Sequence, residues 1–271
     1  MSLLQVTNLR LWDAITNKVL VPSSSFEMKE GSCMAIVGES GSGKSLTCRA
    51  IMNLNKKTIR QSGEIVFKGI RLNQLSEAEM RRKRGKQIYM ILQNGMRAFD
   101  PTSVIGVHLR DTLKHHYGWS QAEIVEKMKQ AMLSVRLQNP VEVMNKYPHQ
   151  LSGGMLQRVM ISLAIVLEPD LIIADEPTSA LDTVSKYEVM EQLAQLREQV
   201  GCSMIFVSHD LGVVRKLADV VLVMRNGIIV ERGDASILFT EAKHEYTRFL
   251  VSSQLKLDEH FQKVVGGPAY D

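Results

Sequence analysis

The 271-residue sequence predicts an α/β fold in which a mostly parallel sheet is joined by an antiparallel β layer and a helical subdomain. Three observations lead to this prediction. Several short runs are apolar throughout, which is typical of parallel strands covered by helices on both faces. The segments 3–30 and 64–69 alternate like half-buried antiparallel strands. The stretch 94–150 has helical patterns and little strand signal, which indicates a helical insert between two core strands.

The predicted elements follow one another in a regular order along the chain. Buried strands are expected at 34–38, 88–92, 171–175, 204–208 and 220–224. Helices are expected at 44–54, 120–136, 154–167 and 183–200. Asn226-Gly227 stands between two apolar runs, a strong signal for a β-hairpin. We expect a single domain over 1–255, a helical subdomain at about 94–165 within it, and a short C-terminal extension at 244–271.

Composition narrows the class of protein. The net charge of +4 indicates a mixed, solvated surface rather than one built for nucleic acid. The start of the chain lacks the pattern of a signal peptide, and no apolar run reaches the roughly 18–20 residues that span a bilayer. Three cysteines lie far apart without a CxxC pair, which argues against a zinc site or disulfides and favours a reducing compartment: Cys33, Cys48 and Cys202.

The segment GESGSGKS at 38–45, called here the phosphate loop, matches G-x-x-x-x-G-K-[ST] between a predicted strand and a predicted helix. Backbone N–H groups of such a loop bind phosphate oxygens, and glycines permit the close approach. Lys44 is expected to contact the β- and γ-phosphates of ATP, and Ser45 to bind Mg²⁺. The alternative, a chance glycine-rich turn, does not explain the flanking elements. The expected ATP contacts are Gly38, Glu39, Ser40, Gly41, Ser42, Gly43, Lys44 and Ser45.

Four polar residues follow predicted core strands, at the edge where ligands bind in α/β sheets. Asp175 ends the run LIIAD, and its carboxylate suits Mg²⁺. Glu176 points elsewhere and can act as general base toward the attacking water. Gln93, after IYMIL, can reach Mg²⁺ or that water, and His209, after MIFVS, can donate a hydrogen bond to the γ-phosphate. Taken singly, the two adjacent acids also fit a solvated strand end, and a lone histidine at such a place is usually structural.

Together with LSGGMLQR at 151–158 and SALD at 179–182, these motifs resemble the ATP-binding subunits of ABC transporters, in the same order. The resemblance implies a RecA-like P-loop NTPase core and the ABC ATPase fold. It also implies a head-to-tail dimer in which each ATP lies between one subunit's phosphate loop and the other's LSGG. By this resemblance, the residues that contact the partner's ATP or its interface are Ser152, Gly153, Gly154 and Asp182.

An aromatic side chain stacks on adenine in this family. Trp12 is the candidate in this sequence, one residue away from the usual position. An ordinary half-buried tryptophan is the alternative.

Within the family, the chain resembles the peptide and nickel import group through SGSGKSLTCRAI, SGGMLQRVMISLAI and VSHDLGVVRKLAD. Leu156 and RAFDP at 97–101 are similar to nickel/cobalt or opine-metallophore (staphylopine-type) importers. The resemblance implies an ATPase that powers uptake of nickel, cobalt or another transition metal as a metallophore complex. A di- or oligopeptide importer is the alternative, and a soluble ABC ATPase acting on nucleic acid or ribosomes is a remote one. Gly95 departs from the group, which usually has proline there.

The resemblance also implies partners and a location. They are a second, paralogous ATPase subunit, two membrane permeases and, indirectly, an extracellular solute-binding protein, with no nucleic acid. The expected location is peripheral, on the cytoplasmic side of the cell membrane.

Overall fold

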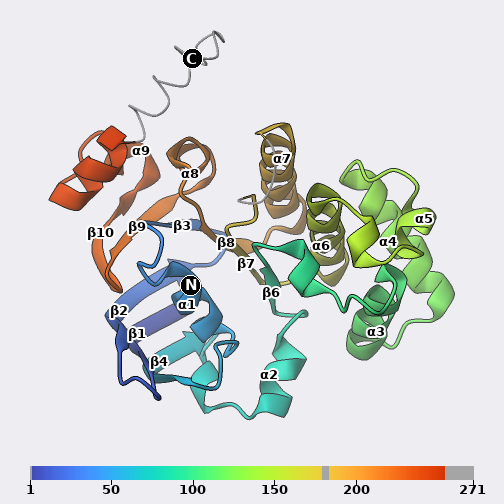
Figure 1. Cartoon of the computed structure of the whole chain (residues 1–271), viewed down its shortest axis with the longest axis horizontal. Coiled ribbons are helices and arrows are strands. Elements are labelled where there is room, and N and C mark those ends of the chain that lie inside the picture. The colour runs from blue at the N-terminus through green and yellow to red at the C-terminus, as the bar shows by residue number, and fades with distance from the viewer. Residues whose placement is uncertain (1, 179–182, 254–271) are drawn as a thin grey trace, which may run out of the picture.

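The structure is a computed structural model that describes residues 2–178 and 183–253. Two sheets lie side by side, and the helical subdomain extends from the larger sheet on the side away from the smaller one (Figure 1). The predicted combination of a mostly parallel sheet, an antiparallel layer and a helical subdomain is confirmed.

The smaller sheet is antiparallel and has the order β2-β1-β4-β5. Burial alternates along much of β2, as expected for strands with one face on the core. The strand predicted at 64–69 begins earlier and ends at Phe67, because Lys68 and Gly69 both adopt positive φ and turn the chain. The strands are β1 (Ser2–Asp13), β2 (Val19–Lys29), β4 (Ile59–Phe67) and β5 (Ile70–Arg71).

The larger sheet has the order β10-β9-β3-β8-β7-β6, and only its β9–β10 pair is antiparallel. Every residue of β3, β7 and β8 is buried, which explains their uninterrupted apolar runs. Because parallel strands end at one edge, the segments after β3, β6, β7 and β8 gather there. The strands are β3 (Cys33–Val37), β6 (Ile88–Ile91), β7 (Leu171–Asp175), β8 (Ser203–Val207), β9 (Val220–Arg225) and β10 (Ile228–Asp234).

The hairpin predicted between the last two strands is confirmed. Arg225 of β9 pairs with Ile228 of β10, and the two residues between them are Asn226 and Gly227. Both have positive φ, 50° and 77°, which is the requirement of a two-residue type I′ turn.

Helices cover the larger sheet near the positions predicted for them. α1 (Lys44–Ile51) ends three residues early, because Asn53 adopts a φ of 52° that a helix cannot continue. α6 (Gly153–Leu167) and α7 (Thr183–Val200) match their predictions closely. The remaining helical segments outside the subdomain are η1 (Leu72–Gln74), α2 (Glu77–Lys83), α8 (Leu211–Leu217), α9 (Ala235–Leu238) and residues 245–253.

The helical subdomain lies between β6 and α6 in the chain. Ser120 begins α4 with a capping box that includes Glu123, so the helix predicted from 120 begins as expected. The buried residues of α3 recur at every fourth position and face the rest of the subdomain. Its elements are η2 (Gly95–Ala98), α3 (Ile105–Tyr117), α4 (Gln121–Ser134), α5 (Pro140–Met144) and η3 (Pro148–Gln150).

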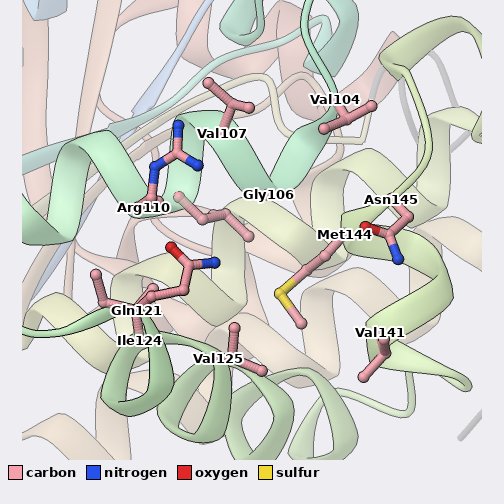
Figure 2. A pocket seen from close by; sticks show the side chains of 11 residues that line it. Val104, Gly106, Val107, Arg110, Gln121, Ile124, Val125, Val141, Met144 and Asn145 are labelled. Carbon is pink, nitrogen blue, oxygen red and sulfur yellow. The ribbon is translucent and has the colours of Figure 1, made fainter.

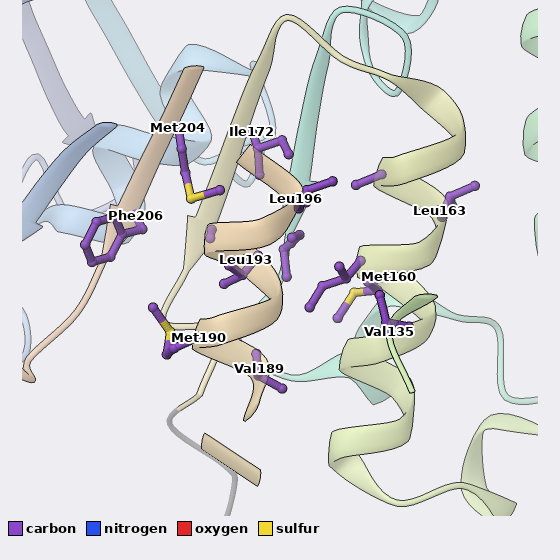
Figure 3. Close-up of a cluster of buried hydrophobic side chains, with 14 of the residues drawn as sticks. Val135, Met160, Leu163, Ile172, Val189, Met190, Leu193, Leu196, Met204 and Phe206 are labelled. Atoms are coloured by element: carbon purple, nitrogen blue, oxygen red, sulfur yellow. The ribbon is translucent and has the colours of Figure 1, made fainter. Parts of the chain in front are cut away.

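The main core joins α6 and α7 to the strands that end at the predicted site. Figure 3 shows Met160 of α6 facing the side of α7 that carries Leu193 and Leu196, with Ile172 of β7 beside them, and Leu163 of α6 belongs to the same cluster. All five side chains are buried. The helix that begins at LSGG is therefore packed against the same layer that carries Asp175 at the end of β7.

Candidate active site

The phosphate loop connects β3 to α1 and holds its own lysine. Lys44 is the first residue of α1 and only 5% exposed. Its Nζ donates hydrogen bonds to the carbonyl oxygens of Gly38 at 2.7 Å and Glu39 at 2.8 Å. Burial lowers the pKa of the Lys44 ammonium, while the nearby carboxylates of Glu176 and Asp175 act in the opposite direction. The loop thus encloses a buried cation at the start of a helix, where backbone N–H groups are open to an anion.

The β9–β10 hairpin supports the phosphate loop from one side. A Cβ on Gly38 would lie 2.1 Å from the carbonyl oxygen of Met224, so only glycine fits there. The N–H of Gly227 donates to the carbonyl oxygen of Ser42 at 2.9 Å. The loop is therefore fixed at its first and fifth residues by a hairpin nearly two hundred residues later.

Ser45 and Asp175 meet next to this loop. The Ser45 hydroxyl donates to Asp175 Oδ1 at 2.6 Å, and Asp175 is fully buried at the end of β7. Arg49, one turn further along α1, places Nη2 3.3 Å from Asp175 Oδ2. Arg49 was not predicted as a site residue, although its spacing of four residues from Ser45 puts both on one helix face. A hydroxyl and a carboxylate in contact form a hard oxygen donor set, which fits Mg²⁺.

Gln93 and Glu176 also lie together, because β6 and β7 are neighbours in the sheet. Gln93 Nε2 donates to Glu176 Oε2 at 3.2 Å. Glu176 has a φ of 46°, the left-handed conformation that glutamate seldom adopts. This turn directs its side chain away from that of Asp175, so two adjacent acids occupy separate places. Strained backbone of this kind is concentrated at functional sites.

His209 is exposed and follows β8, the strand beside β7. The next residue, Asp210, caps α8 through Val213 N and pairs with Lys186 of α7 at 2.9 Å. These contacts fix the backbone on the C-terminal side of the histidine. His209 therefore lies at the same edge of the sheet as Gln93 and Glu176.

Trp12 is half-buried on β1, and the guanidinium of Arg10 lies 5.8 Å from its ring centre. The ring contact that the structure describes for Trp12 is with Arg10 and not with the phosphate loop. The next residue, Asp13, uses Oδ1 to accept the N–H groups of Ile15 and Thr16, which closes the turn after β1.

The LSGG segment forms the start of α6. The Ser152 hydroxyl accepts the N–H of Met155 at 3.2 Å and caps the helix. Ser152 and Gly153 are exposed, so the first N–H groups of α6 face solvent. Asp182 lies outside the described residues.

The family model described as "ABC transporter" matches residues 21–179. The chain belongs to the ABC transporter family. It is 42% identical to the metal-staphylopine import system ATP-binding protein CntD of Staphylococcus aureus over 271 residues, which cover all of both chains. It is 41% identical to the dipeptide transport ATP-binding protein DppD of Lactococcus lactis over 90% of this chain and 70% of that one.

Solved structures agree with this assignment. A dimeric ATP-binding cassette in a post-hydrolysis state with ADP and Pi aligns with a TM-score of 0.76 at 27% identity. The alignment covers 86% of this chain and 98% of that chain. As a member of the ABC family, the chain is an ATPase whose hydrolysis of ATP is coupled to transport.

A residue of the ABC signature that the sequence did not predict as a site residue connects α6 to the segment that carries Gln93. Gln157 is 2% exposed, and its Nε2 donates to the carbonyl oxygens of Leu92 at 3.0 Å and Gln93 at 3.4 Å. Next to it, Arg158 forms an ion pair with Glu188 of α7. The signature helix is thus bonded both to the segment that carries Gln93 and to α7. The sequence offered only the motif LSGGMLQR as a signal for these roles.

Gly95, where the group usually has proline, and Leu156, which the chain shares with the metal importers it resembles, lie against each other. A Cβ on Gly95 would be 2.7 Å from Leu156 Cβ, closer than such atoms approach. Leu156 is fully buried. The turn that follows Gln93 therefore packs directly on α6, and glycine is needed for this approach.

Across residues 2–178 and 183–253, no three His, Cys, Asp or Glu side chains come together as a metal site. The rings of His115 and His116 lie 5.1 Å apart, edge to face. Within those same residues, no helix has the length and hydropathy needed to cross a membrane.

Proposed function

We propose that this chain is the ATP-binding and hydrolysing subunit of an importer for nickel, cobalt or another transition metal, taken up as a metallophore complex. The observation that carries this proposal is the match to a metal-staphylopine import ATPase over the full length of both chains. A di- or oligopeptide importer is the second candidate, supported by 41% identity to the dipeptide transport protein over 90% of this chain.

In this proposal the phosphate loop binds the phosphates of ATP. The ammonium of Lys44, now held by the carbonyl oxygens of Gly38 and Glu39, serves the β- and γ-phosphates. Ser45, Asp175 and Gln93 supply the ligands for Mg²⁺, which neutralises charge on the β- and γ-phosphate oxygens when bound. The remaining loop residues, Ser40 to Gly43, offer N–H groups to the phosphate oxygens.

Hydrolysis requires a base, a means of positioning water and a donor to the γ-phosphate. Glu176 accepts the proton that the attacking water loses, and its left-handed backbone separates it from the Mg²⁺ carboxylate of Asp175. Gln93, in contact with Glu176, orients the water. His209 donates a hydrogen bond to the γ-phosphate from the neighbouring strand end. Trp12 is the candidate for stacking on adenine.

The site is completed by a second subunit. Ser152, Gly153 and Gly154 present the open N-terminus of α6 to the ATP of the partner, where N–H groups and the helix dipole favour the γ-phosphate. Asp182 belongs to the same interface. The dimeric state of the similar cassette with ADP and Pi supports this arrangement. The partner is a paralogous ATPase, which makes the dimer a heterodimer.

Two membrane permeases bind on the surface that includes the segment after β6, and an extracellular solute-binding protein delivers the solute to them. A hollow next to Gln93 is lined by Arg49, Leu54, Met90, Leu92, Asn94 and Arg97. A second hollow, of about 160 Å³, lies among α3, α4 and α5 (Figure 2). Either accepts a short apolar helix of a permease by helix-in-groove contact. This places the chain on the cytoplasmic side of the cell membrane, as a peripheral subunit without nucleic acid partners.

We also propose the organisation in which one nucleotide-binding domain spans 1–255. The helical subdomain occupies about 94–165 within it, and a short extension occupies 244–271. The packing of α3, α4 and α5 on α6 supports the subdomain.

Glu176→Gln tests the catalytic part of the proposal. The amide keeps the size of the side chain and cannot take a proton, so kcat should fall by at least about 100-fold while ATP binding persists. Phosphate release and ATP binding are measured on the same preparation. Glu191→Gln, on α7, is the control for a change of the same kind away from the site. Wild-type turnover by Glu176→Gln would exclude Glu176 as the base.

Transport in the assembled complex tests the substrate. Cells that express this chain with its permeases should accumulate radioactive nickel supplied with an opine metallophore, and Lys44→Ala should abolish that uptake. Uptake of a labelled dipeptide, without uptake of the metal complex, would favour the second candidate.

A further inference from the structure

The phosphate loop has a contact that the proposed function does not use. Tyr246 lies in the helical stretch 245–253, and its side chain is buried, at 3% exposure. Its hydroxyl oxygen accepts the backbone N–H of Glu39 at 2.9 Å. The carbonyl oxygen of Glu39 is held by Lys44. Both backbone polar groups of the second residue in the loop are therefore fixed, one by the lysine of the loop and one by the C-terminal segment.

Tyr246 is itself held firmly. The guanidinium of Arg225, at the end of β9, lies 4.8 Å from the centre of its ring. The carboxylate of Glu231, on β10, accepts the N–H groups of Lys243 at 2.8 Å and His244 at 3.1 Å. His244 Nδ1 in turn accepts the N–H of Tyr246 at 3.1 Å. The tyrosine is thus anchored to the two strands of the hairpin that already supports the loop.

This arrangement gives the loop a preformed shape. A phosphate loop binds ATP through N–H groups that must converge on the phosphates, and ordering them at the moment of binding lowers affinity. A hydrogen bond from the Glu39 N–H to a buried hydroxyl oxygen reduces the freedom of the loop before ATP arrives. The bond also gives a partner to the backbone N–H of Glu39, which precedes Gly41 and Gly43 in the loop.

We propose that Tyr246 is a positioning residue for ATP: its hydroxyl holds Glu39, so the C-terminal segment sets the affinity of the phosphate loop for nucleotide. The inference rests on the proposed function, since it takes the phosphate loop as the ATP site. Tyr246 touches the loop backbone and acts through it.

Tyr246→Phe tests this inference because it removes one oxygen and leaves the packing of the ring. A hydrogen bond of this kind corresponds to about a two- to tenfold change in a binding constant. In the assembled transporter, KM for MgATP should rise by about that factor while kcat stays within about twofold. The dissociation constant for MgATP, measured by calorimetry, should rise in parallel.

Tyr117→Phe is the matched control. The Tyr117 hydroxyl donates to the carbonyl oxygen of Leu167 at 2.8 Å, at the C-terminal end of α6. Both variants lose one hydrogen bond to the backbone, so both lose similar thermal stability. Only Tyr246→Phe should weaken ATP binding. Equal affinity in Tyr246→Phe and the wild type would overturn the inference, as would an equal loss in both variants.

Lys44→Ala separates this inference from the proposed function. If Lys44→Ala loses ATP and Tyr246→Phe does not, the loop is the ATP site and only the role of Tyr246 fails. If Lys44→Ala binds ATP as the wild type does, the proposed site itself fails. Glu231→Gln gives a second variant, since weakening the anchor of the segment should raise KM in the same direction as Tyr246→Phe.

Discussion

Replacing Gly95 by alanine should destabilise the protein through one steric contact. The new Cβ would lie 2.7 Å from Leu156 Cβ and 3.6 Å from Met160 Cε. Leu156 Cβ is attached directly to the backbone of α6 and cannot rotate away, whereas Met160 Cε is the end of a flexible side chain. Gly95 does not have a left-handed φ, so the backbone itself accepts alanine. The expected cost therefore comes from the contact alone.

The magnitude follows from the size of the overlap. Ordinary contacts of a Cβ begin at about 3.4 Å, so η2 or α6 must shift by well over half an ångström. Overpacking a tight core costs about 1–3 kcal/mol, and an overlap with a backbone-fixed atom belongs to the upper part of that range. Alanine also has less conformational freedom than glycine in the unfolded chain, which offsets about 0.4–1 kcal/mol of that cost. The net loss is about 1–2.5 kcal/mol, which lowers Tm by roughly 2–10 °C at about 2–4 °C per kcal/mol.

Scanning calorimetry of the nucleotide-free chain measures this shift. Gly212→Ala, near the start of α8, is the matched control. Its Cβ would lie 3.3 Å from Asp210 Oδ1, about a tenth of an ångström inside ordinary contact, against about 0.7 Å at Gly95. Alanine also has a higher helix propensity than glycine, so the Tm of this control should stay level or rise. A Tm for Gly95→Ala at or above that of the wild type would refute the steric argument.

Three further outcomes are expected. Gln157→Glu places a carboxylate against the carbonyl oxygens of Leu92 and Gln93, so ATPase assays should show a lower kcat, and a wild-type kcat would contradict the role of this bond. In a Trp119→Phe background, ATP should change the fluorescence of Trp12, and unchanged emission would leave it an ordinary half-buried tryptophan. Iodoacetamide should label the cysteines slowly at pH 8 until urea unfolds the chain. The reason is that burial raises their thiol pKa values, to about 12 for Cys33, to about 11 for Cys202 and further still for Cys48. Rapid labelling of the folded chain would contradict this.

Local patterns predicted the strands and the phosphate loop well, because burial and phosphate binding act on neighbouring residues. The strand LIIAD is apolar at each position before Asp175 since both faces of β7 are covered. Helix ends were less predictable. Asn53 ends α1 by adopting left-handed φ, and α2 went unpredicted although Ser76 and Glu79 have the spacing of a capping box.

Contacts between segments far apart in the chain could not be predicted from the sequence. The bond from Glu39 to Tyr246 joins residues 207 positions apart. The approach of Gly95 to Leu156 depends on how α6 crosses the end of β6, which no spacing in either segment reveals. The sequence marked Gly95 as a departure from the group and Leu156 as a feature shared with metal importers, and only the structure shows that they touch.

The position of Gln157 on α6 has a consequence for the timing of the two ATP sites. Five residues separate it from Ser152, a distance of about 7.5 Å along a helix axis. One end of this helix segment holds the backbone of Gln93 in its own subunit, and the other end carries Ser152, which we propose faces the nucleotide of the neighbour. A helix segment of that length moves as one piece, so its two ends cannot respond to the two ATP sites independently. In the proposed dimer, loss of phosphate at one site should therefore move the backbone of Gln93 at the other, and the two sites should turn over in step.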